Sequence, residues 1–217
     1  MMWKAIAAAL LIAMASSQAA PARAWGDQKT SRSAAWLEAQ ALIDGTEAPA
    51  LFENLSSGDS MSIRHKASGL VCVYSPGERN NSLMLFPGLP LGDDVGCNAD
   101  AGNIYMTVYA TRYGAGMSTA DATESAAEGI RNRFADARPY VGPVVVPQVP
   151  EGVGDQGFVA FVVGQGDRTL YAHARLAKVG EWIFKQRMST PEPMAMGAEA
   201  LMSSGRWTAV LEAATAR

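Results

Sequence analysis

The sequence has few of the residues and motifs that enzymes commonly use. It contains two histidines, His65 and His173, among 217 residues, and it has no Gly-x-Ser-x-Gly turn, no His-Glu-x-x-His pair and no Gly-x-x-x-x-Gly-Lys phosphate loop. These absences argue against the enzymes that depend on those motifs. A hydrolase with a site around His173 or His65 stays as an alternative, because catalytic groups meet in space and not in sequence.

An excess of positive charge is also missing. The chain has 18 basic and 21 acidic residues, which argues against nucleic acid and anionic membrane surfaces as partners, since both favour a basic face. Its 48% hydrophobic and 18% charged residues are typical of a globular protein and not of a disordered chain. After the N-terminal segment there is no second apolar run long enough for a membrane span.

The first 24 residues predict a secretory signal peptide. Lys4 provides a positive charge, an apolar run of 11 residues from Ala5 to Ala15 follows, and small residues lead to Ala24. We expect cleavage after Ala24, with Ala19 as the alternative. Cleavage after Ala24 leaves 16 basic and 21 acidic residues, a net charge of −5. The mature protein is therefore expected to be soluble and periplasmic or secreted.

The two cysteines predict one disulfide. Cys72 and Cys97 form an even pair in a chain expected to reach an oxidising compartment. Closing a loop of roughly 26 residues would stabilise the protein by about 3 kcal/mol in the chain-entropy model. Two buried free thiols are the alternative. There is no Cys-x-x-Cys, and two cysteines with two histidines at irregular spacing are a weak metal motif, so we expect no metal and no cofactor.

The N-terminal half predicts a short helix followed by short strands. Apolar residues at helical spacing indicate a helix over residues 33–43, and alternating patterns indicate strands over 61–66, 70–74 and 82–86. Residues 87–98 contain two prolines and three glycines and are predicted to form an irregular loop. Asp93 and Asp94 lie in this loop, but two adjacent carboxylates are too few for a typical oxygen-ligand cation site.

The C-terminal half predicts longer elements. A strand over 103–113 alternates an apolar row with a row of tyrosines and threonines, and a capping box at Ser118 begins a helix that is expected to reach residue 137. An edge strand over 142–149 and a three-stranded meander over 157–163, 168–178 and 181–189 follow. The final helix, 194–214, is expected to be kinked or split at Gly205.

This order of elements predicts a single α+β domain over residues 25–217, a largely antiparallel sheet with helices packed on it as in an α/β/α sandwich. From residue 61 to residue 214 the order resembles the Mog1/PsbP-like fold, in which a hairpin precedes a strand and a long helix, and a meander and a C-terminal helix close the sandwich. Because members of that fold share no common active site, the resemblance implies binding or assembly and not catalysis.

We therefore expect a non-enzymatic exported protein that binds a partner protein or a small ligand. The candidate surfaces are the 87–98 loop, with Asp93 and Asp94, and a sheet face of aromatic and charged residues, Tyr105, Tyr109, Tyr171, His173 and Arg175. A carrier of a small apolar ligand, bound between sheet and helices, is a further alternative, since eleven methionines can line adaptable surfaces.

Overall fold

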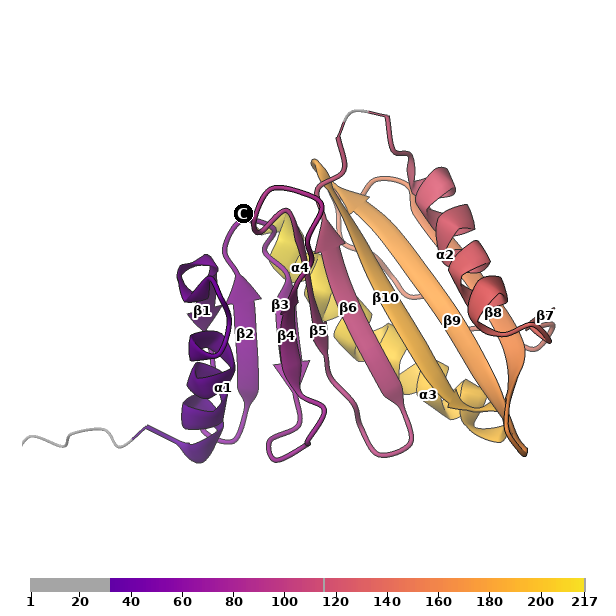
Figure 1. Cartoon of the computed structure of the whole chain (residues 1–217), viewed down its shortest axis with the longest axis horizontal. Helices are drawn as coiled ribbons and strands as arrows, with labels where there is room; N and C mark the ends of the chain where they lie inside the picture. The colour runs from indigo at the N-terminus through magenta and orange to yellow at the C-terminus, as the bar shows by residue number, and fades with distance from the viewer. Residues whose placement is uncertain (1–31, 115, 217) are drawn as a thin grey trace, which may run out of the picture. The chain divides into compact units, whose positions relative to one another are not determined.

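The computed structural model describes residues 32–114 and 116–216, so the expected signal peptide lies outside the described residues. The part of the chain from Arg32 onward forms one compact unit (Figure 1). Its helices are α1 (Ala34–Asp44), α2 (Thr119–Arg133), α3 (Ala195–Leu201) and α4 (Thr208–Thr215). Its strands are β1 (Phe52–Asn54), β2 (Met61–His65), β3 (Val71–Tyr74), β4 (Ser82–Leu85), β5 (Asp94–Asn98), β6 (Tyr105–Thr111), β7 (Arg138–Pro139), β8 (Gln156–Gln165), β9 (Arg168–Val179) and β10 (Trp182–Pro191).

The strands form two sheets. Both are antiparallel, which confirms the predicted α+β class. The larger sheet has the order β4-β5-β6-β10-β9-β8-β7, and the smaller sheet has the order β1-β2-β3. The meander β8-β9-β10 is paired along its whole length, and β10 returns to pair with β6. The strands predicted over 61–66, 70–74, 82–86 and 103–113 are all present, within one or two residues at their ends.

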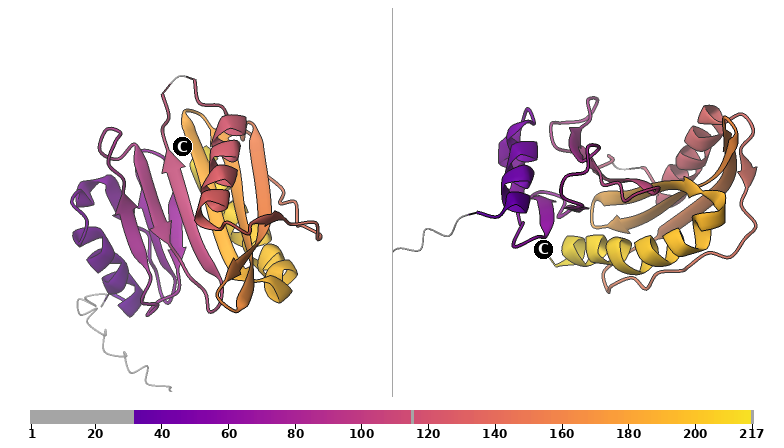
Figure 2. Two further views of the ribbon diagram at one scale, coloured as in Figure 1. Left: turned by 45° about the vertical axis from the view of Figure 1, so that its right-hand side comes forward. Right: turned by 90° about the horizontal axis from the view of Figure 1, so that it is seen from below.

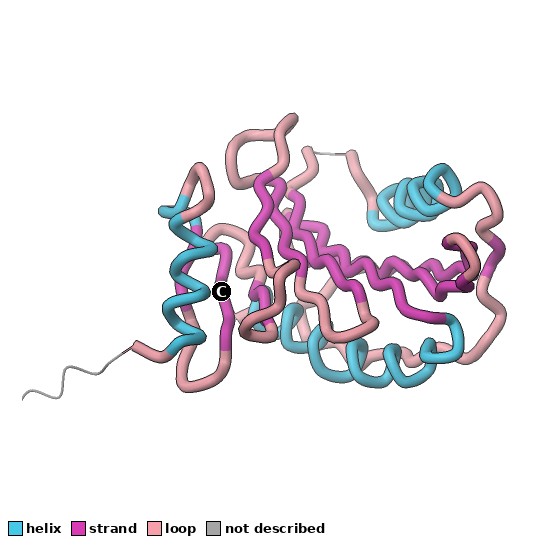
Figure 3. Tube along the Cα trace, turned by 60° about the horizontal axis from the view of Figure 1, so that its bottom comes forward, coloured by secondary structure: helices cyan, strands magenta, loops and turns pink. Residues whose placement is uncertain are grey.

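Helices cover both faces of the larger sheet. Helix α2 packs on β8 and β9 from one side, whereas α3 packs on β10 and α4 on β9 from the opposite side (Figures 2 and 3). We call these sides the α2 face and the α4 face. Helix α2 lies mainly over β8 and β9 and reaches Ile183 at the start of β10, so among the described residues no helix covers most of this face over β5 and β6 (Figure 1).

The local sequence explains where α2 begins and how it packs. The Ser118 hydroxyl accepts a hydrogen bond from the main-chain N–H of Asp121, and the Asp121 carboxylate accepts one from the N–H of Ser118, which completes the predicted capping box. Ala122, Ala127 and Ile130 are buried against the sheet, and small side chains there let the helix approach it closely. The helix ends at Arg133, four residues before the predicted end.

The prediction of an irregular loop over residues 87–98 is wrong in its second half. Residues Asp94–Asn98 form β5, which is paired on both sides, with β4 and with β6. Glycine fits closely at position 96, because a Cβ atom there would lie 3.0 Å from the ring of Tyr109 and 3.0 Å from the carbonyl oxygen of Val108 and would push against both. The glycine that suggested a loop instead permits close packing within the sheet.

In the C-terminal half the structure corrects one prediction, the edge strand, and agrees with another, the division of the final helix. The edge strand is not formed by residues 142–149, which have no regular structure; Arg138–Pro139 pairs with β8 in their place. The final helix is divided as expected, since a π-helical segment, Met202–Trp207, separates α3 from α4 and contains Gly205. Within the described residues, 32–114 and 116–216, no helix combines the length and the apolar character that crossing a membrane takes.

The predicted disulfide between Cys72 and Cys97 is present. It joins β3 of the smaller sheet to β5 of the larger sheet, with a Cα–Cα distance of 6.1 Å. Both cysteines are buried, at 3% and 0% exposure. The bond therefore links the two sheets inside the main hydrophobic core, where α1 and β2 also pack.

Candidate functional site

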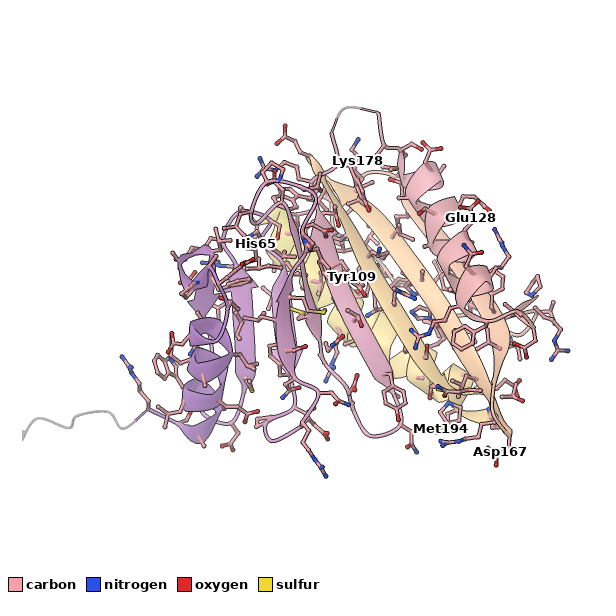
Figure 4. The ribbon with its side chains drawn as sticks, viewed as in Figure 1. His65, Tyr109, Glu128, Asp167, Lys178 and Met194 are labelled. Atoms are coloured by element: carbon pink, nitrogen blue, oxygen red, sulfur yellow. A yellow bond between two sulfur atoms is a disulfide. The ribbon has the colours of Figure 1, made fainter. Side chains whose placement is uncertain are left out.

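The predicted binding face is divided between the two sides of the larger sheet. Tyr109 on β6 pairs with Lys185 on β10, and Lys185 pairs with Leu176 on β9. Directly paired residues share a face, so Tyr105 and Tyr109 lie on the α2 face. Figure 4 shows Tyr109 on the same side of the sheet as α2. The other three predicted residues alternate with Leu176 along β9 and lie on the α4 face: Tyr171, His173 and Arg175.

On the α4 face these three side chains converge on one carboxylate. Glu199 on α3 is fully buried, and its Oε1 atom accepts hydrogen bonds from the Tyr171 hydroxyl and from Nδ1 of His173, each at 2.5 Å. Its Oε2 atom accepts a hydrogen bond from the guanidinium of Arg175. The same guanidinium donates to the carbonyl oxygen of Val145 at 2.5 Å. We call Tyr171, His173, Arg175 and Glu199 the buried polar cluster.

The environment of the cluster fixes its charges. Burial acts to raise the pKa of Glu199, but the hydrogen bond and charge of His173, which is protonated at low pH, together with the hydrogen bond from Tyr171 and the charge of Arg175, outweigh it and lower that pKa to about 2. Burial lowers the pKa of His173, and the charge of Arg175 adds to this effect against the opposing effect of Glu199. Glu199 is therefore ionised at neutral pH and His173 is neutral, which makes Arg175 the cation that balances the buried carboxylate.

The cluster predicts a loss of stability in acid. For both Glu199 and His173 the pKa is lower in the folded state than the ordinary value, 4.5 or 6.5, so the unfolded chain binds more protons as the pH falls. We expect the melting temperature to decrease below about pH 6.5 and more steeply below about pH 4.5, where the contribution of Glu199 is lost. Scanning calorimetry between pH 7 and pH 3 measures this, and Glu199→Gln should remove the steeper part. A variant curve parallel to the wild-type curve would contradict the assignment.

Neither histidine is placed to contact a substrate. The side chain of His173 is fully buried against Glu199, although the strand that carries it forms part of the floor of a groove on the α2 face. His65 is 1% exposed, its Nδ1 atom lies 2.9 Å from the Ser68 hydroxyl, and its ring packs against Phe52 and Trp182. Both are packed in the core, so the alternative of a hydrolase around either histidine gains no support from their positions.

The uncovered part of the α2 face is hollowed into a groove. The groove has a volume of about 860 Å³, which is usual for small-molecule sites. Its floor is formed by β6 and β10, one wall by the end of α2 with Arg133 and Phe134, and the other wall by the turn of residues 79–81. Tyr105, 52% exposed, and Tyr109 lie in the floor with Thr107 between them.

The groove is rich in arginine. Four arginines line it, and Asp100 is the acidic residue among its lining residues: the four are Arg79, Arg133, Arg168 and Arg187. Both carboxylate oxygens of Asp100 already accept hydrogen bonds, one from the N–H of Met106 and one from the amide of Asn80. Within residues 32–114 and 116–216, no carboxylate lies within 4.0 Å of any of these four guanidinium groups.

A second cation adjoins the groove. Lys185 lies two residues before Arg187 on β10, so both side chains are on the α2 face. The Lys185 ammonium lies 4.6 Å from the centre of the Tyr109 ring. Burial and the charge of Arg187 lower the pKa of Lys185, while the charge of Asp94 partly opposes them. A small cavity of about 100 Å³ between α2 and β10 is lined by both cations, so Arg187 lies at the boundary of the two cavities.

The two predicted aspartates lie apart from the groove's arginines and have their own partners. Asp93 forms an ion pair of 3.3 Å with Arg112, and Asp94 accepts a hydrogen bond of 2.8 Å from the Thr111 hydroxyl. Among the described residues, 32–114 and 116–216, there is no group of three or more His, Cys, Asp or Glu side chains that could hold a metal ion. The carboxylates of this segment thus support the local fold.

One glycine pattern also needs its structural context. Residues 152–157 read Gly-Val-Gly-Asp-Gln-Gly, which fits the spacing Gly-x-Gly-x-x-Gly. A dinucleotide-binding turn joins a strand to the N-terminus of a helix. Here Gly152 and Gly154 precede β8 and Gly157 lies within it, and β8 is a strand of an antiparallel sheet, so the pattern is not in that context.

The residues that make the groove basic were not among the predicted site residues. A signal was present in β10, where Lys185 and Arg187 alternate with the buried residues Phe184, Gln186 and Met188. Charged residues at alternate positions of a strand in the middle of a sheet indicate that one face is not covered. Arg133 gave no such signal, because it reaches the groove only through the packing of α2 on the sheet, and Arg168 gave none because it stands at the exposed start of β9.

Comparisons with known proteins give the following results. No protein-family profile and no curated protein sequence matches the chain. Among solved structures, PA94 from Pseudomonas aeruginosa, a protein of unknown function described as a putative regulator, is 12% identical with a TM-score of 0.37 over 66% of this chain and 91% of its own. LpqN from Mycobacterium tuberculosis, described as involved in cell envelope biogenesis, is 8% identical with a TM-score of 0.30 over 74% of this chain and 80% of its own. Both TM-scores are below 0.5, so neither similarity carries an argument about function.

Proposed function

We propose that this protein is an exported binding protein that holds a small polar ligand in the groove on the α2 face. The observation that carries the proposal is the groove itself, a concavity of about 860 Å³ whose floor is the middle of a seven-stranded sheet. A sheet floor with hydrogen-bonded neighbours on both sides is rigid, so a ligand would bind to side chains that are already in place.

The lining favours a small polar ligand over the other candidates. Tyrosine and arginine are residue types that anchor ligands and partners, and here the exposed Tyr105 and the arginines lie in a hollow and not on a flat surface. An apolar ligand would leave the arginine side chains without water or a partner, which is unfavourable. A groove of this size accepts a compact molecule more readily than the broad surface of a partner protein.

The disulfide supports the location. Disulfides persist in oxidising compartments such as the periplasm or the extracellular space and are rare in the cytosol. This agrees with the predicted signal peptide, so the ligand would be a compound that the protein meets outside the cytoplasm. The resemblance to the Mog1/PsbP-like fold adds the same general expectation, a role in binding.

A groove-filling variant tests the proposal. Ser189 lies on β10 opposite Tyr105 and lines the groove, so Ser189→Trp should fill it and exclude the ligand. We expect native mass spectrometry of the wild-type protein, purified from the compartment to which it is exported, to show an additional bound mass, and we expect the variant to lose it.

Leu37→Trp is the matched control, because Leu37 is 56% exposed on the outside of α1 and away from the groove. The control should keep the bound mass, and both variants should melt close to the wild-type temperature. A bound mass that survives in Ser189→Trp would place the ligand elsewhere. A wild-type protein that carries no additional mass, and binds none from an extract of its own compartment, would contradict the proposal.

A further inference from the structure

The groove also indicates what kind of molecule it holds. Resting on the proposed function, we infer that the ligand is an acidic sugar, a short saccharide that carries carboxylate or phosphate groups. The juxtaposition of arginines without carboxylate partners, side-chain amides and tyrosine rings in one groove carries this inference.

The groove is basic although the chain as a whole is acidic. The chain as a whole is acidic, with 21 acidic and 18 basic residues, yet this groove concentrates arginines whose guanidinium groups have no carboxylate within 4.0 Å among residues 32–114 and 116–216. A concave site lined mostly by one sign of charge attracts the opposite charge strongly, whereas the acidic remainder of the chain repels a long polyanion. Together these fields select a short anionic molecule over a nucleic acid.

Arg187 lies close to a second cation. Its side chain is half-buried in the floor and lies on the same face as Lys185, two residues away, so two cations are kept close together. Like charges at this spacing repel each other and are unfavourable in an empty protein. Asp94 on β5 offsets part of the charge, but it is engaged by Thr111. An anionic group bound to Arg187 would relieve the repulsion, and a guanidinium can hold a carboxylate or phosphate with two hydrogen bonds.

The arginines are spread along the groove. Arg187 pairs with Ala174 in the middle of β9, whereas Arg168 is the first residue of that strand and Arg133 is the last residue of α2. Six residues separate positions 168 and 174, which corresponds to about 20 Å along the strand. Since a single phosphate cannot reach both ends, the groove suits a ligand with anionic groups at more than one position.

Aromatic and amide side chains line the groove together with the arginines. Tyr105, 52% exposed, offers an aromatic ring in the floor, and two exposed amide side chains also line the groove, those of Asn103 and Gln165. Flat hydroxyl-bearing rings are matched by aromatic faces together with amides, because one side of such a ring is apolar and its edge donates and accepts hydrogen bonds. Sugar rings have this combination, and inorganic anions do not.

Isothermal titration calorimetry on the full exported protein tests the inference with three probes: trigalacturonate, the neutral trisaccharide maltotriose and inorganic phosphate. We expect trigalacturonate to bind, with an affinity that decreases as salt is added, and the other two to bind at least tenfold more weakly. Arg187→Gln should weaken trigalacturonate binding about tenfold or more, since a hydrogen bond to a charged group is lost. Arg187→Lys keeps the charge but not the two-pronged geometry, so its affinity should lie between those of the wild type and Arg187→Gln.

Arg131→Gln is the control. Like Arg187→Gln it removes one positive charge, but Arg131 lies on α2, is paired with Glu124 and does not line the groove. If maltotriose binds as tightly as trigalacturonate, charge has no role in recognition. If phosphate binds as tightly as trigalacturonate, the sugar has none. If trigalacturonate fails to bind while Ser189→Trp still removes a bound mass, the ligand class is wrong and the groove remains a binding site. If both experiments fail, the proposed function fails with the inference.

Discussion

Replacing Glu199 by alanine should lower the free energy of unfolding by about 3–5 kcal/mol, because the change removes one member of a buried ion pair. Glu199 is fully buried and accepts hydrogen bonds from Tyr171, His173 and Arg175. In the variant the guanidinium of Arg175 stays in the core without its carboxylate, and the Tyr171 hydroxyl loses its acceptor. Urea titrations followed by tryptophan fluorescence measure the difference.

Glu124→Ala is the matched control for this experiment. Glu124 forms an ion pair with Arg131 at 2.5 Å, but both side chains are exposed, at 65% and 45%. Exposed pairs contribute about 0–1 kcal/mol, so this variant should unfold close to the wild-type midpoint. Equal effects of the two substitutions would show that burial of the cluster does not set its energetic importance. Glu199→Gln should fall between them, since it keeps the shape and loses the charge.

Removing the disulfide should cost about 3 kcal/mol of folding stability. The bond between Cys72 and Cys97 closes a loop of 25 residues and joins the two sheets. Without it the unfolded chain gains conformational freedom, and β3 is no longer fixed to β5. We expect Cys72→Ala/Cys97→Ala to melt at a clearly lower temperature than the oxidised wild type.

Reduction gives an independent check of the same bond. The wild-type protein in excess dithiothreitol should approach the melting temperature of the double variant, whereas the variant itself should not respond to the reductant. Intact mass under denaturing conditions confirms that two hydrogens have been gained. A reduced protein of this verified mass that melts like the oxidised one would refute a stabilising role for the bond.

The sequence predicted much of the fold because the patterns involved are local. The alternation of apolar and polar residues in Tyr105–Thr111 and the apolar stripe of α2 depend only on neighbours along the chain. Where a residue serves a distant partner, local reasoning failed. Gly96 was taken as part of a loop although it makes room for Tyr109 from the next strand, and Val145, predicted in an edge strand, lies outside any strand with its carbonyl oxygen accepting from Arg175.

The candidate site shows the same division more sharply. Period-two alternation assigns the residues of one strand to two rows, but it cannot say which row of one strand shares a face with which row of another. That depends on β10 lying between β6 and β9, which sets Tyr109 beside Lys185 and Leu176 and places Arg175 on the opposite side. The five residues predicted to share a face were therefore divided into a groove floor and a buried cluster.

The sequence by itself determined the α+β class, most of the strands, the start of α2 and the cysteine pair, because periodicity, capping and residue counts act over short distances. Only the tertiary structure decided that α2 leaves part of its face uncovered, that Glu199 lies beneath Tyr171 and His173, and that arginines from α2, β9 and β10 meet around one groove. The physical reason is that side chains far apart in the sequence are brought together by strand order and helix docking, which are properties of the whole fold.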